Sequence, residues 1–99
     1  MTNEAFTALL EARITTMREV FAAKSAEYST AGDVLSAFKS AAAFLHCTPR
    51  QALLGMLAKH LVSIVDLVQR DGPIERWEEK IGDSILYLTL LEAIKKESK

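Results

Sequence analysis

The chain is poor in the residues that cross-link, bend or break a polypeptide. Its 99 residues include one cysteine, two prolines and four glycines. The single cysteine, Cys47, cannot form an internal disulfide, and two histidines do not complete a Cys/His zinc site with it. The scarcity of glycine and proline, without any low-complexity tract, argues against disorder, collagen-like repeats and turn-rich β architectures. We therefore expect one mostly helical domain spanning residues 1–99.

The chain also lacks an excess of charge of either sign. Twelve Lys and Arg oppose thirteen Asp and Glu, which gives a formal net charge of -1 and no basic field that would hold a nucleic-acid backbone. The first five residues lack the basic start and apolar stretch of a signal peptide, and no apolar run approaches the roughly 18–20 residues of a membrane span. The sequence thus predicts a cytoplasmic protein with neither a nucleic-acid partner nor a membrane partner.

What the chain does have is apolar residues spaced three and four apart, the period of an amphipathic helix. Together with the boundary signals between them, they predict four helices, at about 3–28, 34–46, 49–69 and 74–97. No segment alternates like a strand, and the short joints favour antiparallel neighbours. The predicted fold is all-α, an up-and-down bundle of four helices.

Three joints carry the boundary signals of these helices. Asp33 follows Gly32 and is placed to cap the second helix. Thr48 and Gln51, with a proline between them, predict a capping box at the start of the third helix. The run 71–73, Asp-Gly-Pro, predicts that the third helix ends with Gly72 as its C-cap glycine.

Two helices carry more apolar surface than one core needs. Helix 49–69 is apolar over most of its circumference, so we expect it to be nearly enclosed. Helix 74–97 has two apolar stripes on nearly opposite sides, and one of them holds Leu86, Leu90 and Ile94. A chain this short forms a marginal core, so we expect the second stripe to meet another subunit in a homodimer or homotetramer.

Charged residues fall on helix faces that point inward in such a bundle. If the helices alternate in direction, one end of the bundle gathers Lys24, Glu27, Asp33, Asp66, Glu79 and Asp83. Clustered carboxylates repel one another unless protons or a cation compensate, and oxygen ligands beside basic residues suit Mg²⁺ with a phosphorylated ligand. This pattern predicts a metal and phosphate site at that end.

Simpler interpretations remain open for each of these residues. Lys24 and Lys80 each lie three residues before an acid and would form local ion pairs at the surface. Asp66 and Arg70 are spaced as an exposed helical pair, and Asp33 serves equally well as a cap. His60 lies among leucines and isoleucine, where a core histidine with one satisfied nitrogen is the alternative to a ligand-binding role.

Four segments resemble small phage and prophage proteins. They are Lys24-Ser-Ala-Glu-Tyr28, Asp33 to Lys39, Lys59-His60 to Asp66, and Glu79-Lys-Ile-Gly-Asp83 with Tyr87. The group is similar to the nucleotide-modification-associated domain family and, more remotely, to the all-α nucleoside triphosphate pyrophosphohydrolases typified by MazG and the dimeric dUTPases. The resemblance implies a helical oligomer in the bacterial host cytoplasm that binds a nucleotide or related phosphorylated small molecule with Mg²⁺.

The resemblance also suggests roles for particular residues. Glu27, Glu79 and Asp83 would hold the metal with Asp66 as an auxiliary ligand. Lys24 and Lys59 would neutralise phosphate charge, Tyr28 would stack on or orient the base, and His60 would also contact the ligand.

The reaction implied is Mg²⁺-dependent nucleoside triphosphate pyrophosphohydrolysis. The MazG pattern has Glu-x-x-Glu on one helix and Glu-x-x-Asp on a later one, whereas here Lys80 stands three residues before Asp83 and the first helix has no Glu-x-x-Glu. The alternative function is a non-catalytic phage interaction or scaffold protein that binds a protein partner through the helix 74–97.

Overall fold

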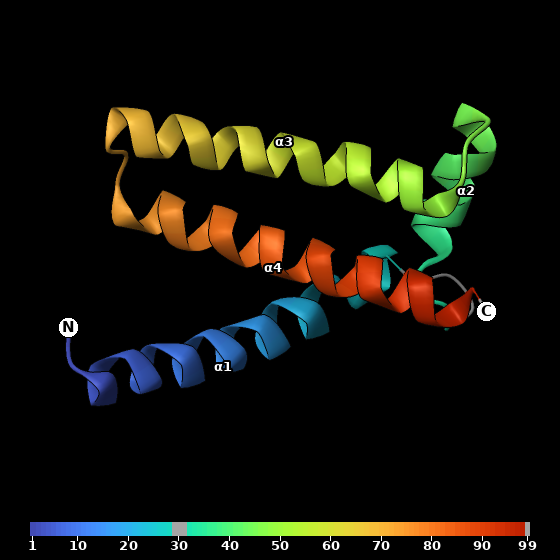
Figure 1. The fold of residues 1–99 in the computed structure, drawn as a ribbon. Coiled ribbons are helices and arrows are strands. Elements are labelled where there is room, and N and C mark those ends of the chain that lie inside the picture. The colour runs from blue at the N-terminus through green and yellow to red at the C-terminus, as the bar shows by residue number, and fades with distance from the viewer. Residues whose placement is uncertain (29–31, 99) are drawn as a thin grey trace.

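The computed structural model of this chain is all-helical, as the sequence predicts. It describes residues 1–28 and 32–98, and among residues 26–28 only the backbone. The helices are α1 (Asn3–Tyr28), α2 (Ser36–Leu45), α3 (Pro49–Arg70) and α4 (Ile74–Glu97) (Figure 1). The predicted boundaries agree with these bounds to within two residues. The largest difference is at α2, which begins at Ser36 rather than at 34 and ends one residue earlier than expected.

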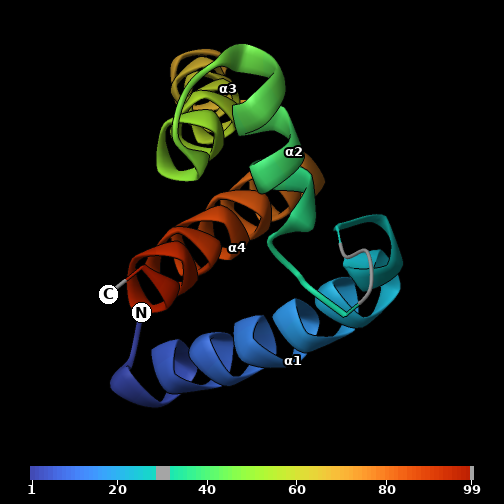
Figure 2. The same ribbon diagram turned by 90° about the vertical axis from the view of Figure 1, so that its right-hand side faces the viewer.

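Helix α4 is the central element of the bundle. In both ribbon views it lies between α3 on one side and α1 on the other (Figures 1 and 2). Helices α3 and α4 form an antiparallel hairpin, and the short α2 lies across the end of that hairpin. Helix α1 crosses α4 instead of running antiparallel to it, so the simple alternation of directions expected from the short joints holds only for the α3–α4 pair.

The hydrophobic core lies where α2, α3 and α4 meet. Phe38 of α2 and Leu53 of α3 are fully buried, and Leu86, Leu90 and Ile94 of α4 pack with them. The prediction that these α4 residues meet another subunit is therefore wrong. Because α4 is central, this stripe has its partners within the chain, and the docking surface proposed on it for a protein partner is occupied by the core.

Both outer helices keep apolar surface open to solvent. The prediction that α3 is nearly enclosed is wrong, because its outer face has no neighbour and leaves Leu61, Val62 and Val65 between 45% and 68% exposed. The same holds for Phe6 and Ile14 of α1, each 51% exposed. Helix α3 is also long and apolar enough to cross a membrane by length and composition, a test that core helices of soluble proteins pass as well. The sequence analysis looked only for uninterrupted apolar runs and so did not identify α3 as a helix of this kind.

The boundary of α3 matches the sequence at its start and departs from it at its end. Thr48 Oγ1 accepts the Gln51 N–H at 3.2 Å, and Gln51 Oε1 accepts the Thr48 N–H at 2.9 Å, which confirms the capping box. At the other end Asp71, not Gly72, adopts the left-handed conformation, with φ of 50°. Gly72 contacts α3 instead: a Cβ there would collide with the end of the Leu67 side chain, which would have to move to admit it.

Alanine substitutions at two glycines should have effects of opposite sign. Gly72→Ala should lower the free energy of unfolding by about 1 kcal/mol, because Leu67 must move to admit the methyl group. Gly55→Ala, in the interior of α3 with open space around its Cβ position, should raise it by about 0.5–1 kcal/mol through helix propensity. Urea denaturation of the two variants measures both, and a Gly72→Ala variant at least as stable as wild type would contradict this packing.

Asp33 lies near the C-terminal end of α4, where Lys39 of α2 bridges it to Glu97. Asp33 lies three residues before the start of α2, and its carboxylate accepts the Leu35 N–H at 2.9 Å. Leu35 and not Asp33 occupies the N-cap position, so Asp33 fixes the segment that leads into α2. Lys39 Nζ lies 2.7 Å from Asp33 and 2.6 Å from Glu97. Asp33 therefore sits beside the C-terminal end of α4, and the prediction that it gathers with Glu79 and Asp83 is wrong.

These contacts set the direction of two pKa shifts. The hydrogen bond from Lys39, and then the one from the Leu35 amide, lower the pKa of Asp33 below its ordinary 3.8. The hydrogen bonds to Asp33 and Glu97 raise the pKa of Lys39 above 10.5. A lowered acid pKa contributes stability that is present above the unfolded-state pKa and is lost as the pH falls through the folded-state value. The raised Lys39 pKa contributes below 10.5 and is lost as the pH rises through its folded-state value.

The melting temperature should reveal this pair through its pH dependence. Asp33→Asn should melt below wild type at neutral pH, and the difference should shrink below pH 4 as the wild-type carboxylate becomes protonated. Thermal melts from pH 3 to 8 test this. Glu92→Gln, which removes the exposed ion pair with Lys96, is the matched control and should follow the wild-type curve closely. A difference for Asp33→Asn that is constant with pH would count against the assignment.

Candidate functional site

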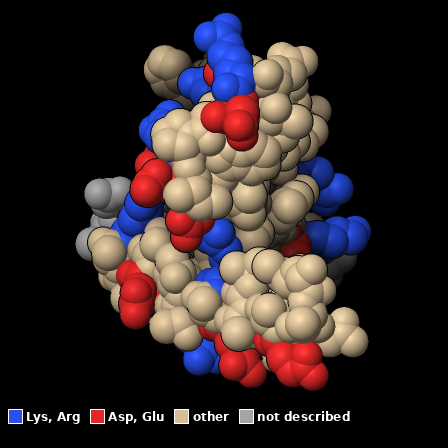
Figure 3. Space-filling view, turned by 90° about the vertical axis from the view of Figure 1, so that its left-hand side faces the viewer, with Lys and Arg blue, Asp and Glu red and all other residues tan. Residues whose placement is uncertain are grey.

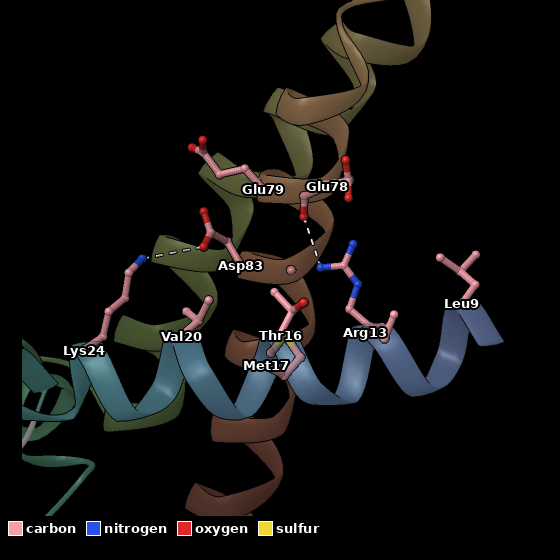
Figure 4. A pocket seen from close by; sticks show the side chains of 11 residues that line it. Leu9, Arg13, Thr16, Met17, Val20, Lys24, Glu78, Glu79 and Asp83 are labelled. Carbon is pink, nitrogen blue, oxygen red and sulfur yellow. Dashed lines mark hydrogen bonds and ion pairs between the residues drawn. The ribbon is translucent and has the colours of Figure 1, made fainter. Parts of the chain in front are cut away.

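A cleft of about 330 Å³ lies where α1 crosses the first half of α4 (Figure 4). Its floor is apolar and its rim is charged, with cations contributed by α1 and carboxylates by α4. The lining residues are Leu9, Ala12, Arg13, Thr16, Met17, Val20, Lys24, Glu78, Glu79, Gly82 and Asp83. The volume is at the lower end of the range for small-molecule sites.

Helical periodicity explains how these side chains come to share the cleft. On α1, Arg13, Met17, Val20 and Lys24 recur every three or four residues and so lie on one face. On α4, Glu79 and Asp83 are one turn apart. Figure 4 shows the Lys24 and Arg13 side chains reaching from α1 towards α4, with the Asp83 side chain directed towards Lys24.

The roles of Arg13 and Gly82 in the cleft were not predicted from the sequence. Arg13 Nη1 donates a hydrogen bond to the Glu78 backbone carbonyl at 3.2 Å (Figure 4). The guanidinium occupies the space that a side chain at Gly82 would take, since a Cβ there would lie 2.8 Å from Arg13 Nη1. A glycine inside a helix is a sign of close approach by a neighbour, and Gly82 carried that signal.

Asp83 is the point where three helices meet. Its Oδ1 lies 3.7 Å from Lys24 Nζ of α1, and its Oδ2 lies 3.7 Å from His60 Nδ1 of α3. The side chain is only 16% exposed. Both distances exceed hydrogen-bond length, so Lys24 forms an ion pair with the carboxylate, and His60 lies beside it, without either one hydrogen-bonding to it. Of the predicted site residues, the structure thus brings Lys24, His60 and Asp83 together.

His60 also links the cleft to the hydrophobic core. Its ring lies 4.9 Å, centroid to centroid, from Tyr87 of α4, and Tyr87 meets Phe38 edge to face at 5.9 Å. The imidazole is therefore fixed on one side by an aromatic cluster while one ring nitrogen faces Asp83. This arrangement orients His60 towards the carboxylate rather than towards solvent.

The remaining predicted residues lie apart from this junction. Glu79 lines the rim and is shared between Arg76 at 3.5 Å and Lys80 at 3.6 Å, so Lys80 pairs with Glu79 and not with Asp83. Asp66 is exposed and pairs with Arg70 at 2.8 Å, which is the surface pair that the sequence offered as the alternative.

Lys59, Glu27 and Tyr28 are the other residues that the sequence predicts for the site. Lys59 is exposed on α3, and it does not line the cleft. Glu27 and Tyr28 belong to the last turn of α1, and the predictions for their side chains lie outside the described residues.

Glu79 and Asp83 are the carboxylates of the cleft that the sequence analysis assigned to a metal ion. Within residues 1–25 and 32–98, His, Cys, Asp and Glu side chains do not form any group of three that would hold a metal ion. Two carboxylates one turn apart nevertheless suit Mg²⁺, which usually takes one or two protein carboxylates and completes its shell with water and ligand phosphates. The donor set therefore fits a Mg²⁺ ion that binds together with a phosphorylated ligand.

The surface near this end of the molecule shows no dominant charge. On the face drawn in Figure 3, Lys and Arg side chains lie interspersed with Asp and Glu around uncharged surface. Such a face offers no continuous basic stripe for a nucleic-acid backbone.

No known family model, curated protein or solved structure matches this chain. The resemblance to the nucleotide-modification-associated domain family and to MazG therefore stays a prediction.

Proposed function

We propose that this chain binds a nucleotide, or a related phosphorylated small molecule, together with Mg²⁺ in the cleft between α1 and α4. The observation that carries the proposal is the pairing of Lys24 with Asp83 across the cleft, with Glu79 one turn away on the same wall. Cations for phosphate, carboxylates for the metal and an apolar floor for a base are then contributed by one cavity.

The parts of the ligand are assigned by charge and polarity. Lys24 and Arg13 would face the phosphates, because they are the cations that line the cleft. Glu79 and Asp83 would hold Mg²⁺, which neutralises phosphate charge and polarises a phosphoryl oxygen when bound. Met17 and Val20 offer apolar surface to a base, and Tyr28, in the last turn of α1, is proposed to stack on it.

Ligand binding has to replace existing contacts, and these contacts are weak. Asp83 lies 3.7 Å from Lys24 and from His60, and Glu79, which is 53% exposed, pairs with Arg76 at 3.5 Å and with Lys80 at 3.6 Å. Exposed pairs of this kind stabilise a protein by less than about 1 kcal/mol. The Glu79 carboxylate is therefore available to a metal at little cost, and Asp83 has no hydrogen bond to Lys24 or His60 to give up. Asp66 and Lys59 take no part in this proposal, because neither lines the cleft.

The reaction that we propose for this site follows from the resemblance to MazG. Water would attack the α-phosphorus of a nucleoside triphosphate and break the α–β phosphoanhydride bond, which leaves the monophosphate and releases pyrophosphate. Lys24 and Arg13 would neutralise the charge that develops on the phosphates. The proposal includes self-association and a location in the cytoplasm of a phage-infected bacterial host.

A panel of nucleoside mono-, di- and triphosphates with Mg²⁺ tests binding by isothermal titration and thermal melting. Ligand at about ten times its Kd should stabilise the fold by about 1.4 kcal/mol and raise Tm by roughly 5–10 °C. Asp83→Asn and Glu79→Gln should remove most of the Mg²⁺-dependent part of this shift while keeping the helical circular dichroism spectrum. Pyrophosphate release measures turnover in the same samples.

Glu92→Gln is the matched control, because Glu92 is on α4 but pairs with Lys96 outside the cleft. It should bind as wild type does. No heat, no Tm shift and no pyrophosphate at high protein concentration would overturn the proposal. A shift that survives chelation of Mg²⁺ and the Asp83→Asn substitution would rule out this metal site.

A further inference from the structure

The chain exposes more surface than a compact monomer of its size. Its accessible surface is 7129 Å², whereas a folded monomer of this mass typically exposes about 5,600 Å². Its radius of gyration is 15.2 Å, compared with about 13 Å for a compact domain of 100 residues. The excess of about 1,500 Å² lies within the range that one subunit buries in an obligate dimer.

Part of this open surface is apolar and belongs to α1. We define the outer face of α1 as Phe6, Leu10, Ile14 and Phe21, which are 40% to 51% exposed and recur at helical spacing. Beside it an apolar groove of about 490 Å³ runs between α1 and α4, where Ile14 and Phe21 face Ile85 and Ala93. Exposed phenylalanines along a groove are typical of the buried centre of an interface.

Charges along the edge of this face show which partner fits. Glu11 and Arg18 lie on the same edge, two turns apart, and neither side chain has an ion-pair partner among the residues that the structure describes. When two copies of a helix pair antiparallel around a two-fold axis, the same edge of each lies on the same side. An axis near Ile14 brings Glu11 of each copy opposite Arg18 of the other.

We propose that the outer face of α1 and the adjoining groove bind α1 of a second copy of this chain, antiparallel and around a two-fold axis near Ile14. A second copy would bury the excess surface, fill the apolar groove and place opposite charges against Glu11 and Arg18. Within its own chain α1 is anchored to α4 by Arg13, Lys24 and a few apolar contacts. The second copy would therefore also brace the helix that forms one wall of the cleft.

Sedimentation equilibrium of the full chain tests the surface. Wild type should be a dimer at submillimolar concentration, and Ile14→Glu should be a monomer, because it places two carboxylates together at the axis. Val65→Glu is the matched control on the outer face of α3, with 55% exposure against 51% for Ile14. It should remain a dimer. A monomeric wild type, or dissociation by Val65→Glu but not by Ile14→Glu, would overturn the proposal.

Charge reversal tests the orientation without touching the apolar face. Glu11→Arg and Arg18→Glu should each weaken the dimer about tenfold, since each replaces two symmetric attractions by repulsions. The double variant restores opposite charges across the interface and should recover most of the wild-type dissociation constant. Failure of the double variant to recover would exclude the antiparallel pairing. These readouts depend on mass alone, so failure of nucleotide binding would leave them unaffected.

Discussion

The structure depends on α4, because this helix packs against α2 and α3 on one side and against α1 on another. This helix packs Leu86, Leu90 and Ile94 into the core with α2 and α3, and it presents Glu79 and Asp83 to α1 on another side. Because the other three helices arrange themselves around it, α4 sets both the position of the core and the position of the cleft. A second consequence is that α1 and α3 are separated by α4 and each keep an apolar face open to solvent.

The helices and their boundaries were predictable because their signals are local. A capping box at Thr48 and Gln51 is a matter of four consecutive residues, and it appears in the structure as expected. The partner of each apolar stripe was not predictable in this way. Periodicity indicates that a stripe is to be covered, but it carries no information on what covers it. For this reason Leu86 was placed at a subunit contact and is found in the core, whereas α3 was expected to be enclosed and is open.

The candidate site shows the same division between local and long-range information. The sequence placed Lys24 and Asp83 at a common site, and they are neighbours, but the expectation rested on helices that alternate in direction, whereas α1 crosses α4. That difference in topology moved Asp33 to the opposite end of α4, where it pairs with Lys39. The role of Arg13 was not predicted because it depends on where α1 crosses α4, and the local signal for that crossing was the glycine at position 82.

The placement of α1 against α4 has a consequence for how the protein is made. Of the four helices α1 is synthesised first, yet α4, the helix that it packs against, is synthesised after the other three. The α3–α4 hairpin joins neighbours in the sequence and can form as soon as both are available, whereas α1 must wait until α4 has been made. Through that interval the phenylalanines of α1 have no intramolecular cover, so nascent chains emerging close together on one messenger RNA would be well placed to find each other.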